Sequence, residues 1–259
     1  DYKGALGIAG SRWVGLKHFR SFFNSYNFLQ LLRNTLALSL YSLAAGFPLP
    51  ILLALLLNET KSRFKRFSQT VLYAPHFISM VVMVGMLNTL FSPSMGVINT
   101  LREALGMERY YYMAQPSAFR HLYVWSGVWQ NIGWDAVIYL AALSAVDPSL
   151  HEAAMIDGAS RIQRITHINL PTILPTIVIL FIMAVGRVAS VGYEKVYLLQ
   201  NDLNVDVSEV ISTYVYKRGV LNSNYSFSTA VGLFNNVVNI ALLLMANFIS
   251  RRLGETSLF

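Results

Sequence analysis

The chain has 259 residues, of which 54% are hydrophobic and only 13% are charged, and its formal net charge is +7. A typical soluble domain carries about 25% charged residues, so this composition excludes an ordinary soluble domain and also a disordered or collagen-like chain. The sequence contains no cysteine, which excludes disulfides, cysteine-based metal sites and thiol nucleophiles. The basic residues are therefore interpreted first as signals of membrane topology.

Five apolar stretches are long enough to cross the hydrocarbon core of a bilayer, which needs roughly 20 residues. Each contains a glycine, a proline or a polar residue, and transmembrane helices tolerate these where neighbouring helices satisfy the backbone. The sequence therefore predicts an all-α membrane protein, a polytopic helical bundle. The predicted spans cover residues 34–57, 68–90, 119–146, 171–193 and 228–249.

Lysine and arginine are denser in residues 58–67, 147–170 and 250–259 than in the other connections. The positive-inside rule places these three segments, and with them the C-terminus, in the cytoplasm. An odd number of visible spans then puts residues 1–33 on the extracytoplasmic side. Since no signal peptide is visible, we expect one further span upstream of residue 1. Residues 97–105 alternate apolar and charged residues at helical spacing and predict a short interfacial helix.

The connection 147–170 has the pattern of two short helices. Asp147 is a good N-cap for a helix that starts at Pro148, and Gly158 is a typical end signal. Ser160 and Gln163 have the spacing of a capping box that starts a second helix. The sequence therefore predicts two cytoplasmic helices at an angle, with small residues that allow another protein to approach closely.

The same connection contains Glu-Ala-Ala, three further residues, a Gly, and then a distal Ile-x-Leu-Pro. This pattern resembles the EAA motif of bacterial ABC-importer permeases. In that family the element is a coupling helix, which sits in a groove of a separate ATP-hydrolysing subunit and passes its motion to the membrane helices. The resemblance assigns this coupling role to Glu152, Ala153, Ala154, Asp157 and Gly158, with Ile168, Leu170 and Pro171 matching the distal part.

Other segments extend the resemblance over nearly the whole chain. Residues 13–19, 34–35 and 73–75 look like stretches of sugar-type permeases, and residues 192–199 look like permeases for complex oligosaccharides such as the aldouronate and alginate importers. The resemblance implies a multi-pass permease of the bacterial cytoplasmic membrane that moves oligosaccharides by alternating access and is not an enzyme. It implies three kinds of protein partner: a second homologous permease, two ATPase subunits and an extracytoplasmic solute-binding protein.

No P-loop pattern occurs in the sequence. We therefore expect no cofactor on this chain, with ATP and Mg²⁺ bound by the partner ATPase, and no metal site. The basic run at residues 61–66 is interpreted as a topology determinant at the lipid headgroups, so no nucleic-acid partner is expected.

Polar and aromatic residues inside the spans are candidates for the substrate pathway, because such residues are costly in lipid. In maltose-type relatives the helix before the coupling element lines the cavity. Arg187 is the only basic residue that the predicted spans place deep in the membrane, with Asp135 as its candidate partner, and a structural ion pair explains this pair equally well. Helix packing is the favoured alternative for the asparagines. The candidates are Trp129, Gln130, Trp134, Asp135, Tyr139, Arg187, Tyr193, Glu194, Asn235 and Asn239.

Three alternatives remain open at this stage. The same architecture can import another solute, such as a peptide or glycerol phosphate. A secondary transporter or channel is a different class, but it would be expected to show an inverted repeat, and none is visible. An intramembrane enzyme is disfavoured because His151 and Glu152 begin a zinc-protease pattern that lacks its second histidine.

Overall fold

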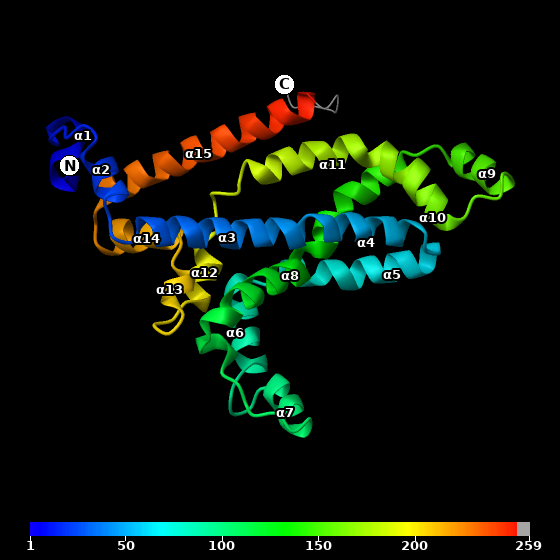
Figure 1. Ribbon diagram of the computed structural model, residues 1–259, viewed down its shortest axis with the longest axis horizontal. Coiled ribbons are helices and arrows are strands. Elements are labelled where there is room, and N and C mark those ends of the chain that lie inside the picture. Colours follow the sequence, from blue (N-terminus) through cyan, green and yellow to red (C-terminus); the bar gives the residue numbers. More distant parts are fainter. Residues whose placement is uncertain (253–259) are drawn as a thin grey trace. The chain divides into compact units, whose positions relative to one another are not determined.

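The computed structural model describes residues 1–252, which are mostly helical (Figure 1). No named strand occurs among these residues, and this agrees with the predicted all-α class. Residues 253–259 lie outside the described part, so the predicted cytoplasmic C-terminus is not described. The short helices are α1 Gly7–Gly10, α2 Lys17–Phe23, α7 Val97–Ala104, α9 Pro148–Ile156, α10 Arg161–Arg164, α12 Tyr193–Leu199, α13 Val205–Ser208 and α14 Ile211–Val215.

The long helices follow the predicted spans with shifted ends. They are α3 Phe28–Gly46, α4 Pro48–Asn58, α5 Ser62–Tyr73, α6 Met80–Leu90, α8 Pro116–Ser144, α11 Leu170–Val185 and α15 Tyr225–Arg252. Turns of 3₁₀ helix occur at Gly4–Leu6, Ala74–Phe77 and Tyr112–Ala114, and π-helical turns at η4, Ile165–Asn169, and η5, Tyr216–Leu221. Helix α7 is present where the sequence predicts a short helix, and its interfacial position stays a prediction.

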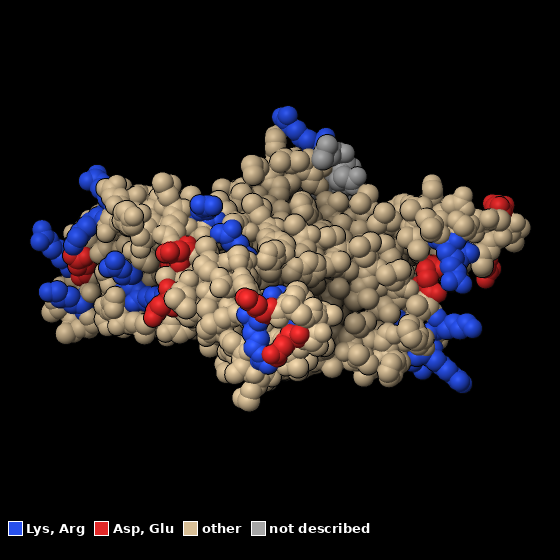
Figure 2. All heavy atoms as spheres, turned by 60° about the horizontal axis from the view of Figure 1, so that its bottom comes forward, with Lys and Arg blue, Asp and Glu red and all other residues tan. Residues whose placement is uncertain are grey.

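Within residues 1–252, three helical segments are long and apolar enough to cross a membrane: Phe28–Asn58, Arg161–Val185 and Tyr225–Arg252. A fourth is obtained if the bent pair of α5 and α6 counts as one span. Helix α8, with 29 residues, is as long but is not among them. The polar side chains of α8 make it less apolar than the other long helices. For this reason fewer candidate spans are found than the five that the sequence predicts. Figure 2 shows large uncharged areas between patches of charged side chains, as a surface in contact with lipid requires.

The second predicted span, residues 68–90, is not one straight helix. Helices α5 and α6 are separated by the 3₁₀ turn Ala74–Phe77 and bend by 98°. Pro75 lies at the start of that turn and lacks the amide needed to continue the α-helix. Ser79 then caps α6 by accepting a hydrogen bond from the amide of Val82. A straight helix through residues 68–90 is therefore excluded, while the bent pair can still count as one broken span.

The fourth predicted span ends earlier than expected. Helix α11 stops at Val185, and residues 186–189 form a turn. At Gly186 a Cβ atom would lie 2.8 Å from the side chain of Leu243 in α15, so the close approach of the two helices requires glycine here. As a consequence, Arg187 lies in the turn and is exposed. Its predicted position deep inside a helical span was wrong.

The described residues form two compact units. Unit 1 contains Asp1–Leu40, Ser79–Tyr123 and Arg187–Ala241, and unit 2 contains Tyr41–Ile78, Val124–Gly186 and, among the described residues, 242–252. The boundaries fall within α3, α8 and α15, so these helices contribute residues to both units.

Unit 2 has a core built from α4, α8 and α11. Its buried residues are Ala54, Leu55, Leu57, Ala136, Tyr139, Leu140, Leu143 and Ile173. Partly buried residues of η4 and α11, Ile165 and Leu170, also pack against this core. The core therefore connects the base of the α9–α10 segment with the helix that precedes it and with α4.

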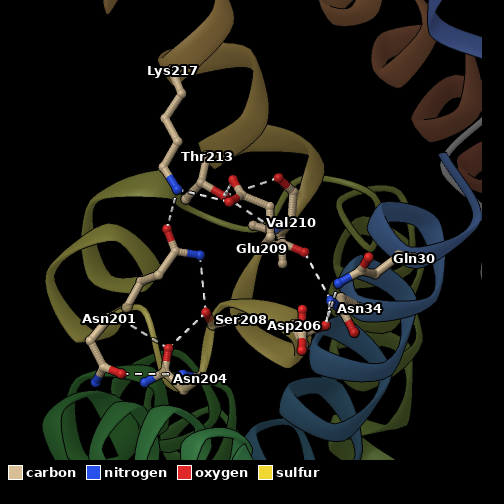
Figure 3. Close-up of polar contacts among 11 residues, drawn as sticks. Gln30, Asn34, Asn201, Asn204, Asp206, Ser208, Glu209, Val210, Thr213 and Lys217 are labelled. Carbon is tan, nitrogen blue, oxygen red and sulfur yellow. Dashed lines mark hydrogen bonds and ion pairs between the residues drawn. The ribbon is translucent and has the colours of Figure 1, made fainter. Parts of the chain in front are cut away.

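Unit 1 is held together by an aromatic core around Phe22 and by a polar network (Figure 3). Asn34 of α3 donates hydrogen bonds to the backbone oxygens of Asp206, at 2.8 Å, and Glu209, at 3.0 Å. Lys217 Nζ lies 2.7 Å from Glu209 Oε2 and 2.5 Å from Gln200 Oε1. Buried Asn34 thus satisfies backbone carbonyls of an irregular segment, which explains a polar residue at this place in α3.

Candidate coupling element and transport pathway

Helix α9 begins with the cap that the sequence predicts. Asp147 has an extended backbone, and its Oδ1 accepts a hydrogen bond of 2.9 Å from the amide of Ser149. Pro148 occupies the first helical position, where its missing amide costs nothing. The Ser149 amide lowers the pKa of the Asp147 carboxyl below its ordinary value, so this cap is charged at neutral pH.

Gly158 ends α9 in a Schellman motif. Its φ angle is +77°, in the left-handed region that glycine adopts without strain. The amide of Ala159 bonds to the oxygen of Ala154 at 2.8 Å, and the amide of Gly158 bonds to the oxygen of Met155 at 3.1 Å. These two bonds reverse the chain after α9 and set the direction in which α10 starts.

Helix α10 starts with the predicted capping box. The amide of Gln163 donates to Ser160 Oγ at 3.4 Å, and the amide of Ser160 donates to Gln163 Oε1 at 2.7 Å. The π-helical turn η4 follows α10 directly and leads into α11, which has Pro171 in its first turn. The prediction of two short helices joined by a glycine turn in residues 147–170 is confirmed.

The α9–α10 element exposes apolar side chains. Glu152, Ala153, Asp157 and Gly158 are exposed, and Ala154 is half-buried. The exposed apolar residues of the element are Leu150, Met155, Ile156 and Ile162, with 50, 53, 87 and 73% of their surface accessible. Exposed apolar side chains gathered on a short projecting element indicate a surface that binds another protein.

The predicted pathway residues of α8 divide into exposed and buried sets. Trp129 and Trp134 are each 46% exposed, and Asp135 is also exposed. Gln130 is buried and donates to the backbone oxygen of Ile78 at 2.7 Å, so it supports the break between α5 and α6. Tyr139 is only 3% exposed and belongs to the core of unit 2, because α8 turns this side toward α4 and α11. Its role in the pathway stays a prediction.

His76, at the break between α5 and α6, is a residue that sequence reasoning left aside. Its ring lies flat on the indole of Trp134, with centroids 4.6 Å apart and an interplanar angle of 1°. Asn131 donates its own amide to the oxygen of Gly127, so its Oδ1 accepts from His76 Nδ1 at 2.9 Å. The only sequence signal for this group was the neighbouring Pro75, which indicates a break but not its partner.

Close packing fixes the same break against α8. A Cβ atom at Gly133 would lie 2.1 Å from the backbone oxygen of Leu72 in α5, so only glycine fits at this contact. The break, His76 and Trp134 are therefore held in one arrangement within unit 2.

The remaining candidates lie in unit 1. Tyr193 is 46% exposed and stacks on Tyr216 at 4.9 Å, and Glu194 is exposed. Arg187 is exposed, and because it belongs to unit 1 whereas Asp135 belongs to unit 2, their pairing stays a prediction.

The two asparagines of α15 differ. Asn239 donates to Ser190 Oγ at 2.6 Å and accepts from the amide of Ala189 at 3.0 Å, so it ties α15 to the segment after α11. This favours the helix-packing alternative for Asn239. The Oδ1 atom of Asn235 is buried and has no hydrogen-bond partner among the described residues, and its role stays a prediction.

Apolar helices long enough to cross a membrane, an exposed two-helix element and polar side chains within α8 are features expected of a membrane transport subunit. Residues 46–255 match the family described as binding-protein-dependent transport system inner membrane component, and the chain belongs to this family. The predicted class, a permease of the ABC-importer type, is confirmed.

Similar proteins support this assignment. The chain is 45% identical to the polygalacturonan/rhamnogalacturonan transport system permease protein YteP of Bacillus subtilis, over 100% of this chain and 81% of that protein. It resembles the structure of a bacterial alginate ABC transporter in complex with an alginate pentasaccharide-bound periplasmic protein. The TM-score is 0.91 and the sequence identity 42%, over 98% of this chain and 88% of that chain. A second similar structure is that of a bacterial ABC transporter involved in the import of the acidic polysaccharide alginate. Its TM-score is 0.89 and its sequence identity 43%, over 93% of this chain and 85% of that chain.

Proposed function

We propose that this permease imports oligosaccharides released from polysaccharides, and that α9 and α10 couple the transport to ATP hydrolysis by partner subunits. The observation that carries the coupling role is the α9–α10 element itself. Two caps and a Schellman turn hold it in a defined shape, while its apolar side chains are left exposed. A loop that only connected two membrane helices would not need this construction.

The coupling residues are Glu152, Ala153, Ala154, Asp157 and Gly158. Small residues at 153, 154 and 158 allow a partner backbone to approach closely, and the exposed carboxylates of Glu152 and Asp157 offer polar contacts at the edge of the apolar surface. Closure of an ATPase pair moves this element, and the movement passes through the core of unit 2 to α4, α8 and α11.

The cargo assignment is supported by the named substrates of the similar proteins and by the exposed aromatic residues of α8. Sugars present flat apolar faces and many hydroxyl groups, and the half-exposed indoles of Trp129 and Trp134 beside Asp135 match that chemistry. Further contacts along the pathway are proposed for Tyr193, Glu194, Arg187 and Asn235. Arg187 would make its contact from the exposed turn after α11 and not from within a helix.

The complete transporter contains a second permease of this family, two ATPase subunits that bind ATP and Mg²⁺, and an extracytoplasmic solute-binding protein. Residues 58–67 and 147–170 face the cytoplasm together with the C-terminus, as the positive-inside rule requires. In this arrangement the α9–α10 element lies on the side where ATP is available, and the solute itself is not changed chemically.

The experiment that tests the assembly is purification of the tagged chain in mild detergent, with identification of the co-purifying proteins by mass spectrometry. We expect an ATPase subunit and a second permease. ATP hydrolysis by that complex should rise when oligosaccharide and the solute-binding protein are added. Isolation of the chain alone or as a homo-oligomer in every detergent would contradict the proposal and favour a transporter that works without ATP.

A further inference from the structure

Glu59 is a carboxylate in the turn between α4 and α5, and the proposed coupling role does not use it. Helix α4 ends at Asn58 and α5 begins at Ser62, and the side chain of Glu59 is only 17% exposed. A carboxylate that is largely withdrawn from water is unfavourable unless it is paired. The partners of Glu59 therefore show what this turn is attached to.

Both partners come from the segment directly after the glycine turn. Arg164, the last residue of α10, places a guanidinium nitrogen 3.5 Å from Glu59 Oε2, and its side chain is 14% exposed. Asn169, the last residue of η4, is fully buried and donates its amide to Glu59 Oε1 at 3.4 Å. Glu59 thus links the α4–α5 turn to residues 105 and 110 positions further along the chain, within unit 2.

Two polar atoms where Glu59 meets Arg164 and Asn169 have no hydrogen-bond partner in the described part of the chain. The Nε atom of Arg164 and the Oδ1 atom of Asn169 are buried and have no hydrogen-bond partner among residues 1–252. The segment between these two residues is the π-helical turn η4, a conformation that is rare and occurs often at functional sites. Buried polar groups without a partner are rare and call for an explanation, and a junction that rearranges during transport provides one.

We propose that Glu59 is a positioning residue that joins the α4–α5 turn to α10 and η4, so that movement of the α9–α10 element reaches α4 and α5 directly. This inference rests on the proposed coupling function and adds a second route to it besides packing in the core. Loss of the Glu59 charge should leave the α9–α10 surface able to bind the ATPase but should reduce the transport obtained from each ATP.

The test compares Glu59→Gln with Glu103→Gln in the complete transporter reconstituted into liposomes. Glu103 is a matched control, because it forms an ion pair with Arg109 at 2.6 Å that is largely exposed. We expect Glu59→Gln to lower oligosaccharide uptake per ATP hydrolysed about tenfold, and Glu103→Gln to change it less than about twofold. A Glu59→Gln complex present in a smaller amount but with the wild-type uptake per ATP would overturn the inference, because it would show a structural role only.

Two rescue variants keep the test decisive if Glu59→Gln does not fold. The swapped pair Glu59→Arg with Arg164→Glu restores opposite charges, and we expect at least half of the wild-type uptake per ATP. The chain has no cysteine, so Glu59→Cys with Asn169→Cys introduces a single pair that a short bifunctional thiol reagent can join. We expect poor uptake per ATP before cross-linking and recovery after it. Failure of both rescues would refute the inference.

Failure of the underlying function is distinguishable from failure of this inference. If the wild-type chain does not assemble with an ATPase, or if Gly158→Pro leaves uptake unchanged, the coupling proposal itself fails. If the wild type is active and sensitive to Gly158→Pro but Glu59→Gln has the wild-type uptake per ATP, only the role of Glu59 is wrong.

Discussion

Replacing Gly158 by alanine perturbs the α9–α10 element at a single backbone position. The φ angle of +77° is unfavourable for any residue with a Cβ atom, whereas a Cβ atom at this position would meet nothing within 4 Å. The cost is therefore entirely one of backbone conformation, about 1–2 kcal/mol. This corresponds to a factor of about 5–30 in the population of the native turn.

Gly106 is a matched control for this substitution. It follows α7, has a φ angle of +76°, and also has no atom within 4 Å of a Cβ position. Its turn has the same two hydrogen bonds, from the amide of Met107 to the oxygen of Arg102 at 2.9 Å and from the amide of Gly106 to the oxygen of Glu103 at 3.0 Å. Gly106→Ala therefore costs the same backbone energy in a helix outside the coupling element.

The assay measures uptake of labelled oligosaccharide and ATP hydrolysis by the transporter in liposomes. We expect Gly158→Ala to lower uptake per ATP at least about fivefold, and Gly158→Asn to lower it less, because asparagine tolerates this region better. Gly158→Pro should abolish uptake, because proline fixes φ near −65°. Insertion into the membrane should be unchanged in all three variants.

Two results would refute the reasoning. Wild-type uptake by an assembled Gly158→Pro complex would show that the shape of the turn is irrelevant to transport. An equal loss in Gly106→Ala and Gly158→Ala would show that the effect comes from general destabilisation and not from the coupling element.

Three further substitutions have expected outcomes. Ser160→Ala removes one half of the capping box and should destabilise α10 by about 1 kcal/mol, seen as faster amide hydrogen exchange in residues 161–164; unchanged exchange would contradict the cap. Gly133→Ala places a methyl group against a backbone oxygen and should destabilise the permease by about 1–3 kcal/mol, whereas Gly85→Ala, in open space, should not. The measurement that compares the two variants is the temperature at which each loses its monodisperse state on heating in detergent. Trp134→Ala should lower oligosaccharide-stimulated ATP hydrolysis about fivefold. The control is Trp125→Ala, which removes another exposed indole of α8, one that donates a hydrogen bond to Tyr41 Oη at 2.9 Å, and should leave the hydrolysis nearly unchanged. An equal loss in both variants would contradict a specific role of Trp134.

Local sequence was sufficient for the α9–α10 element. The caps at Asp147 and Ser160 and the end signal at Gly158 depend on hydrogen bonds between residues at most five positions apart. Such bonds form wherever the residues allow them, almost independently of the rest of the chain. For the same reason the membrane class and the approximate positions of the long helices followed from composition and apolar length.

Side-chain roles within the helices required the tertiary structure. Tyr139 and Trp134 are five positions apart in α8, yet one is buried in a core and the other is half exposed. The sequence pattern marks both as aromatic residues of a membrane helix and does not show which neighbour each one faces. The exposed position of Arg187 has a similar cause, since α11 ends where Gly186 meets Leu243 of α15.

The sequence by itself determined the class of this protein, the approximate positions of its long helices and the shape of the short α9–α10 element, because apolar length and capping act over neighbouring residues. Only the tertiary structure decided the 98° bend between α5 and α6, the stacking of His76 on Trp134 and the pairing of Glu59 with Arg164. The contacts of His76 and of Glu59 join segments that are more than 50 residues apart in the sequence, and the bend between α5 and α6 is held by contacts of the same kind. Pro75 marks the break locally, but the size of the bend and the two side-chain pairings depend on the packing of whole helices, which no local pattern encodes.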